Sequence, residues 1–258
     1  MEVLQRTANR GSISTGAYEI DNSLKFEADN SEQLSRDVSS TGSRTTATVS
    51  MWIKRTELGA AQYLFTYGNT DNDNGRTFAR FQSDDTLRIM GGNTTWRNTN
   101  RVFRDTSAWM HIVIAFDTTQ STANDRIKLY INGVQETSFS TTNNPSEDGT
   151  LGLNFEKQVI GYNSIDGGSY FSGYMTEIVH QDGTASAPTE FGKTDSDTGI
   201  WIPKNVSGVA SGTNGFYLDF SDSANLGNDA SGGTDFTENN ITSADQATDT
   251  PTNNFCTI

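Results

Sequence analysis

Short segments of alternating polarity follow one another along most of the chain. In residues 48–55 (TVSMWIKR), Val49, Met51 and Ile53 alternate with other side chains, and residues 126–132 (RIKLYIN) repeat the pattern. Alternation with a period of two is typical of strands that bury one face of a sheet. Counting further segments of this kind, the sequence predicts roughly ten strands. The further segments are residues 62–67, 77–81, 86–90, 111–117, 158–162, 170–180 and 215–220.

Helical signals are scarce by comparison. The one short candidate is residues 186–192 (SAPTEFG), where Ser186 could cap a helix and Pro188 would lie in its first turn. Antiparallel strands without helices to cover them pair sheet on sheet. The sequence therefore predicts an all-β fold, a two-sheet antiparallel β-sandwich. Asn132-Gly133, between apolar strand residues, supplies the positive φ of a tight hairpin turn.

The pattern divides the chain into three parts. Residues 1–22 hold few large apolar side chains and predict an extended N-terminal arm. Residues 23–220 predict the sandwich, and residues 221–258, rich in Asp, Asn, Gly and Thr, predict a tail or linker that wraps it. Ile258 is expected to be either an unusual terminus or the edge of a longer product.

Charge narrows the range of partners. The chain of 258 residues has 18 Lys and Arg against 32 Asp and Glu, a net charge of −14, so phosphate backbones and anionic lipid surfaces would be repelled. We expect no nucleic acid partner. No stretch approaches the roughly 20 apolar residues that cross a bilayer, and the start lacks the apolar core of a secretion signal, so we expect neither membrane insertion nor export by the general pathway.

Few residues suited to catalysis are present. The chain has one cysteine, Cys256, and two histidines, His111 and His180, each inside an apolar run where a structural role is expected. Glycoside hydrolases need two carboxylates across a sugar bond. The sandwich glucanases place them as Glu-x-Asp-x-x-Glu, whereas here Glu-Ile-Asp at residues 19–21 is followed by leucine at the sixth position. Glu177 has no acidic neighbour two residues away, and Asp182, five residues on, is expected to follow the end of the strand, so we expect no enzyme.

Acidic loops raise the question of calcium, which binds Asp, Asn and backbone oxygens. Three loops qualify by composition: residues 71–74, residues 195–198 and residues 219–235. Asp219, Asp222 and Asp229 in the last loop are weak candidate ligands. Asp, Asn and Gly also form turns, and no loop has the spacing of a helix-loop-helix calcium site, so turn formation is the alternative explanation.

Aromatic residues are the usual floor of a sugar site. Trp52, Trp109 and Trp201 lie in or beside strand patterns and are expected to pack. Trp96 falls in a polar segment, residues 91–100 (GGNTTWRNTN), which predicts a loop; its ring is either exposed for a ligand or folded over the sheet edge. Trp96 and Arg97, with Asp71 and Asp73 of the first acidic loop, are the candidate ligand-binding residues.

Four segments together resemble a known family. Residues 109–117 (WMHIVIAFD) and 129–134 (LYINGV), with residues 47–55 and 171–183, resemble the laminin-G-like, concanavalin A-like jelly roll. Five flanking segments are similar to the type of this domain found in virion proteins of tailed bacteriophages, especially marine ones. These are residues 6–15, 23–36, 197–204, 215–222 and 249–255.

The resemblance implies a non-enzymatic virion surface protein, such as a tail or head fibre, made in the host cytoplasm and carried on the particle. Its partners would be other virion proteins, docked by the arm, and host surface glycan. It would be a homo-oligomer or present in many copies. Alternatives are a structural capsid decoration or tail cementing protein that binds no sugar, and a glycan depolymerase. The resemblance supplies no catalytic or binding residue.

Overall fold

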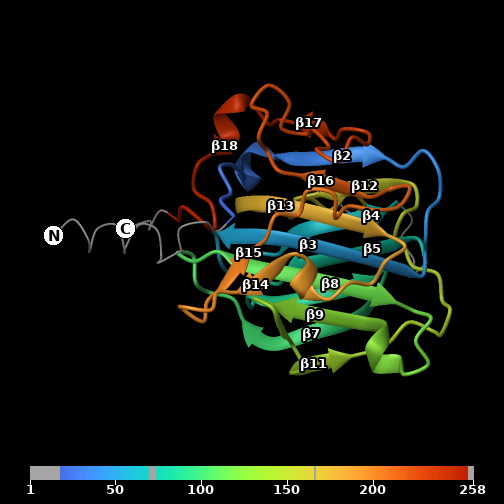
Figure 1. Ribbon diagram of the computed structural model, residues 1–258. Coiled ribbons are helices and arrows are strands. Elements are labelled where there is room, and N and C mark those ends of the chain that lie inside the picture. Colours follow the sequence, from blue (N-terminus) through green and yellow to red (C-terminus); the bar gives the residue numbers. More distant parts are fainter. Residues whose placement is uncertain (1–17, 70–73, 166, 255–258) are drawn as a thin grey trace.

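Two antiparallel sheets stack face to face in the computed structural model (Figure 1). The structure describes residues 18–69, 74–165 and 167–254. The predicted fold class is confirmed. Asp71, Asp73 and residues 1–17, most of the predicted arm, lie outside the described residues.

Sheet A has the ten-residue strand β3 near its centre, and β3 is the segment with the clearest alternation in the sequence. Val49, Met51 and Ile53 of β3 point into the core, as predicted. In order, the strands of sheet A are β10 (Val134–Gln135), β9 (Ile127–Ile131), β8 (Met110–Asp117), β3 (Thr46–Arg55), β13 (Gly173–Asp182), β1 (Ser23–Phe26) and β18 (Gln246–Ala247), with β16 (Phe216–Leu218) also paired to β13.

Sheet B covers the opposite side of the core. In order, its strands are β11 (Phe139–Thr142), β7 (Thr94–Val102), β6 (Thr86–Gly91), β5 (Arg76–Phe81), β4 (Gln62–Gly68), β12 (Lys157–Ile160), β2 (Gln33–Asp37) and β17 (Thr237–Asn239). Side chains such as Leu34, Phe65 and Ile89 meet those of sheet A in one buried cluster. Burial of these apolar surfaces is the main stabilising contribution to a sandwich of this kind.

A small two-stranded sheet lies on the outer face of sheet A (Figure 1). It consists of β14 (Gly192–Thr194) and β15 (Trp201–Pro203). The indole Nε1 of Trp201 donates a 3.0 Å hydrogen bond to Nδ1 of His111, and the two rings are stacked. The short helical candidate is a single 3₁₀ turn, η3 (Pro188–Glu190), that leads into β14. The other 3₁₀ turns of the described chain are η1 (Ala28–Asn30), η2 (Ala123–Arg126) and η4 (Ser243–Asp245).

The hairpin between β9 and β10 has the predicted turn. Ile131 pairs with Val134, and Asn132 and Gly133 both have positive φ, 49° and 78°. A Cβ atom at Gly133 would lie 2.4 Å from the ring of Trp201. Gly133 therefore serves both the turn and the close approach of β15.

The segment after residue 220 lies along both sheets. Strand β17 pairs with β2 at the edge of sheet B, and β18 pairs with β1 at the edge of sheet A. Nζ of Lys54 lies 2.8 Å from Oδ2 of Asp249, in a buried ion pair that joins this segment to β3. The sandwich thus includes residues well beyond 220. No helix in the described part of the chain has the length and apolar character needed to span a membrane.

Candidate functional site

Trp96 and Arg97 lie in strand β7, so the prediction of a loop over residues 91–100 is wrong. The register between β6 and β7 shifts between the pairs Ile89–Arg97 and Met90–Thr95, which inserts Trp96 as an extra residue. At this bulge both side chains turn toward the interior. Trp96 is 2% exposed and meets Phe116 of sheet A edge to face. It is a core residue and offers no ring to a ligand.

The guanidinium of Arg97 connects the two sheets at their open edge. Its terminal nitrogens donate to five acceptors, the carbonyls of Trp96, Asn143, Asn124 and Ile127 and the side-chain oxygen of Asn144. Burial lowers the pKa of Arg97 to about 10, so the group is still charged at neutral pH. No carboxylate of the described chain forms an ion pair with it.

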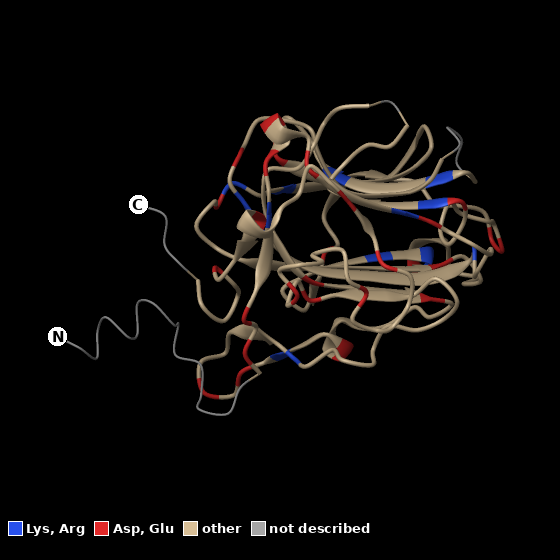
Figure 2. Ribbon diagram, turned by 90° about the horizontal axis from the view of Figure 1, so that it is seen from above, with Lys and Arg blue, Asp and Glu red and all other residues tan. Residues whose placement is uncertain are grey.

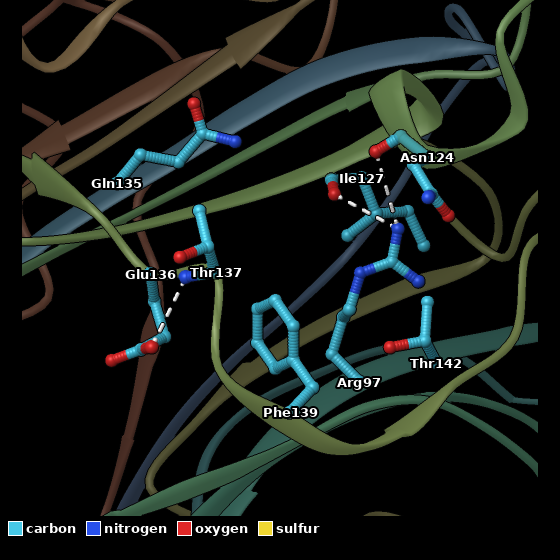
Figure 3. A pocket seen from close by; sticks show the side chains of 8 residues that line it. All are labelled: Arg97, Asn124, Ile127, Gln135, Glu136, Thr137, Phe139 and Thr142. Carbon is cyan, nitrogen blue, oxygen red and sulfur yellow. Dashed lines mark hydrogen bonds between the residues drawn. The ribbon is translucent and has the colours of Figure 1, made fainter.

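A pocket opens beside Arg97, where β10 of sheet A and β11 of sheet B approach each other (Figure 3). We term it the edge pocket; its cavity is about 170 Å³. The half-buried ring of Phe139 stands beside Arg97, with 5.7 Å between ring centroid and guanidinium carbon. Eight residues line the pocket: Arg97, Asn124, Ile127, Gln135, Glu136, Thr137, Phe139 and Thr142.

The polar groups at the mouth of the edge pocket are available to a ligand. Within the described residues, the side chains of Gln135, Thr137 and Thr142 form no hydrogen bond. Glu136 is held in place, because its Oε1 accepts from the backbone N–H groups of Thr137 and Ser138, at 3.0 and 2.8 Å. An aromatic ring, a cation, a fixed carboxylate and free amide and hydroxyl groups together suit a small ligand with hydroxyls and one apolar face.

Two other hollows are less suitable, the first because its polar groups pair with one another and the second because it is mainly acidic. A cavity of about 250 Å³ on the outer face of sheet A is lined by Tyr130, but its Lys128 pairs with Asp125 at 3.2 Å and its Gln120 donates to Asp117 at 2.5 Å. A wider hollow beside β1 and η1 is mainly acidic, with Glu27, Asp29 and Glu57.

The calcium candidates serve turns and an ion pair. Asp219 and Asp222 each accept a backbone N–H two residues on, from Ser221 and Ala224, which is turn chemistry. Asp229 is buried; it accepts from the backbone N–H of Tyr217 and lies 3.2 Å from Arg36. Across residues 18–69, 74–165 and 167–254, no group of three or more His, Cys, Asp or Glu side chains is arranged to hold a metal ion. Asp195 likewise caps its own turn.

Glu177 was noticed in the sequence only as an isolated carboxylate, and the structure gives it an unusual setting. It lies in a bulge of β13 between Thr176 and Val179, with a positive φ of 50°. It is 4% exposed, and burial raises the pKa of its carboxyl to about 7, although hydrogen bonds from Tyr217 and Tyr18 oppose the rise. The group is half protonated near neutral pH and faces two phenols, without a second acid in hydrogen-bond contact.

Both histidines have the structural role predicted. His111 bonds Ser50 through Nε2 at 2.8 Å, and Nε2 of His180 is 2.6 Å from Oδ1 of Asn154. Complete burial lowers the pKa of each to about 3, so both are neutral. Neither lines the edge pocket.

The sequence pointed to Arg97 but missed the other groups of the edge pocket. Phe139 was the available signal, since it is a single aromatic residue in the polar run that follows the Asn132-Gly133 hairpin. Gln135 and Glu136 lie between that hairpin and Phe139, and no local pattern distinguishes them from surface residues. Only the pairing of β11 with β7 brings them beside Arg97.

A family model agrees with the sandwich. The Laminin_G_3 family model, described as the concanavalin A-like lectin/glucanases superfamily, matches residues 26–189. No curated protein matches the sequence. Among solved structures, a heptameric SAP-like pentraxin from Limulus polyphemus is similar, with 18% identity, coverage of 66% of this chain and 80% of that chain, and a TM-score of 0.46.

Two further solved structures show the same kind of likeness. The CBM40 of the Ruminococcus gnavus IT-sialidase bound to α2,3-sialyllactose has 14% identity, coverage of 61% of this chain and 91% of that chain, and a TM-score of 0.40. Domains LG4-5 of the mouse laminin α1 chain have 13% identity, coverage of 68% and 48%, and a TM-score of 0.45.

Proposed function

Because this chain belongs to the Laminin_G_3 family of the concanavalin A-like lectin/glucanases superfamily, we propose that it is a non-enzymatic glycan-binding protein. The observation that carries this proposal is the edge pocket, where the ring of Phe139 stands beside the buried cation of Arg97. A pyranose would place its apolar face on the ring, and its hydroxyls would bond Gln135 and the carboxylate of Glu136.

The carboxylates support binding rather than hydrolysis. A glycosidase needs an acid and a second carboxylate on either side of the sugar bond. Glu136 is the one carboxylate among the lining residues of the edge pocket. Glu177, the carboxylate with the raised pKa, lies in β13 of sheet A and is buried against Tyr18 and Tyr217. Phe139 lies in β11 of sheet B.

Phe139 provides the direct test of glycan binding. We expect the wild type to bind members of an array of bacterial surface polysaccharides, and Phe139→Ala to weaken that binding at least about tenfold, through loss of stacking and apolar contact. Phe155→Ala is the matched control, since Phe155 is also half-buried beneath an arginine, Arg44, with 4.3 Å between ring centroid and guanidinium carbon. Equal binding by wild type and Phe139→Ala would refute the edge pocket as the ligand site.

The proposed setting is the surface of a tailed-phage particle, where the sandwich would be displayed in many copies. The sequence segments similar to phage virion proteins support it. Weak binding at each site would be strengthened by multivalency, because linked copies raise the effective concentration. Electron cryomicroscopy of the particle should place the edge formed by β10 and β11 toward solvent. Density showing that edge buried between capsid or tail subunits would favour a cementing role instead.

A further inference from the structure

A row of polar side chains crosses the outer face of sheet B, on the side away from the core. Residues directly opposite one another on neighbouring strands share a face of the sheet. By that register, Tyr63 of β4 is opposite Arg80 of β5, Arg80 is opposite Arg88 of β6, and Arg88 is opposite Asn98 of β7. Alternate residues such as Ala79 and Ile89 point the other way, into the core.

Two arginines face each other at the centre of this row. Both are half-buried, and neither forms an ion pair with a carboxylate of the described chain. Like charges directly opposite each other on adjacent strands are destabilising. Asp84 is the nearest acid that influences Arg88, and its Oδ1 already accepts from the backbone N–H and hydroxyl of Thr86, at 3.0 and 2.6 Å. Two guanidinium groups against this one carboxylate leave a net positive charge at the pair.

Contacts with neighbouring residues hold the two guanidinium groups in place. The carbon of the Arg80 guanidinium lies 5.2 Å from the ring centroid of Tyr63 and 5.9 Å from that of Phe78, and Nη1 donates to the Tyr63 hydroxyl at 2.9 Å. Nε of Arg88 donates to Oδ1 of Asn98 at 3.0 Å. Both terminal nitrogens of Arg88, and Nη2 of Arg80, form no hydrogen bond within the described residues. They are donors fixed in position before any ligand arrives.

This positive site contrasts with the rest of the molecule. The net charge is −14, and Figure 2 shows most Asp and Glu in loops while many Lys and Arg lie on strands. A negative overall field repels polyanions at long range, and salt screens such interactions beyond about 8–10 Å. A direct contact between an anionic group and the two guanidinium groups is screened less than this long-range repulsion. The paired arginines are therefore suited to a polymer whose negative charges are widely spaced along the chain, because such a polymer is repelled less at long range.

We propose that the outer face of sheet B binds an anionic polysaccharide, with a carboxylate or sulfate group of the chain clamped between Arg80 and Arg88. Strands are spaced by about 4.8 Å, so one oxyanion can bridge both guanidinium groups. The row from Tyr63 to Asn98 spans about 14 Å across four strands, which accommodates an extended chain running across the sheet. This site lies on a different face from the edge pocket and does not rest on it.

The test is titration calorimetry of the full chain at low and moderate salt. The probes are oligogalacturonate for carboxylate, dextran sulfate for sulfate, dextran as the neutral polymer, and single-stranded polynucleotide as a phosphate polymer. We expect binding of oligogalacturonate or dextran sulfate, weaker at higher salt, and none of dextran at this site. The Arg80→Gln/Arg88→Gln variant should lose at least about tenfold in affinity.

Two controls make the result specific. Arg101→Gln removes an exposed arginine of β7, in the same sheet, whose guanidinium also lies over an aromatic ring, that of Phe103. This change should leave the affinity within about twofold. Phe139→Ala should leave binding of the charged polymers unchanged, which separates this site from the edge pocket. The double variant should still unfold cooperatively near the wild-type temperature, because removal of the like-charge contact offsets the lost contacts with Tyr63 and Asn98.

Three outcomes would overturn the proposal. One is an absence of binding to both anionic polysaccharides at low salt. Another is an equal loss of affinity in Arg101→Gln and in the double variant, which would indicate non-specific attraction. The third is polynucleotide binding as strong as polysaccharide binding, with the same loss on substitution of Arg80 and Arg88.

Discussion

The hydroxyl of Tyr217 donates a 2.7 Å hydrogen bond to Oε1 of Glu177, although Glu177 sits in a bulge with left-handed backbone conformation. A non-glycine residue with such a φ costs about 1–3 kcal/mol unless its surroundings compensate. Here the phenols of Tyr217 and Tyr18 both contact the carboxyl group. The strained backbone thus directs a single acid into a buried polar contact between β13, β16 and the N-terminal segment.

This contact predicts a specific pH dependence of stability. The pKa of Glu177 is raised from 4.5 to about 7, so the folded protein holds a proton that the unfolded chain has lost. The resulting stabilisation is complete below pH 4.5 and is lost as the pH rises to about 7, by roughly 3 kcal/mol in total. We expect Glu177→Gln to lie within about 1 kcal/mol of the wild type at pH 5 and to exceed its free energy of unfolding at pH 8 by roughly 3 kcal/mol.

Urea unfolding at the two pH values measures this difference. His111 and His180 have lowered pKa values and destabilise both proteins alike as the pH falls below 6.5, so the comparison between variants removes their contribution. Glu156→Gln is the control for backbone conformation, since Glu156 has a φ of 62° but is only half-buried. A difference in free energy of unfolding between the wild type and Glu177→Gln that does not increase from pH 5 to pH 8 would contradict the prediction.

A second prediction separates the calcium hypothesis from a structural role of Asp229. Asp229 pairs with Arg36, whose guanidinium also donates to Asn214 O at 2.7 Å and lies over the rings of Phe216 and Phe236. Asp229→Asn leaves that cation buried without its partner and should cost about 3–5 kcal/mol in free energy of unfolding. Asp222→Asn, at an exposed turn, should cost less than about 0.5 kcal/mol.

Guanidinium unfolding with and without calcium checks both parts of this prediction. We expect the cost of Asp229→Asn to be the same in calcium chloride and in a chelator. A calcium-dependent rise in the melting temperature of the wild type that is absent from Asp229→Asn would contradict this expectation and support calcium binding at Asp229.

The third prediction concerns the bulge that turns Trp96 inward. A Cβ atom at Gly91 would lie 2.0 Å from Cζ2 of Trp96, so the glycine and the indole occupy adjoining space. Trp96→Ala should cost about 3–5 kcal/mol and Gly91→Ala about 1–3 kcal/mol. Because the two changes act on the same space, Gly91→Ala should cost less in the Trp96→Ala background than alone. Strictly additive costs in a denaturant double-mutant cycle would show that the two residues are independent.

Alternation in the sequence predicted those strands whose two faces differ strongly in polarity. Strands β3 and β9 were found this way, as was the turn at Asn132 and Gly133. Strand β7 was missed because its sequence, TTWRNTNRV, is polar. Its Arg97 and Asn98 form hydrogen bonds with η2 and β11, which are distant in sequence, and with the preceding strand β6, and no local pattern reports such bonds.

The same reasoning explains the limits on predicting the site. Arg97 was identified as a candidate by its residue type. The burial of its side chain was not predicted, because a buried cation needs carbonyl groups that only the fold brings together. The paired arginines of sheet B were missed for a different reason. Arg80 and Arg88 are ordinary surface positions in their own strands, and only the register of β5 against β6 makes them opposite.

The pairing of the first and last described segments has a mechanical consequence. The backbone N–H of Ile20 donates to Oγ1 of Thr252 at 2.9 Å, and Ser23 and Leu24 pair antiparallel with Ala247 and Gln246. A force that pulled these two segments apart would load their bonds one after another, as in opening a zipper. A force applied to both together, against a ligand held at the β10–β11 edge, would not separate the two segments and would be carried by the long central strands of sheet A. The sandwich should therefore resist traction between its ligand and a common support far better than separation of its own ends.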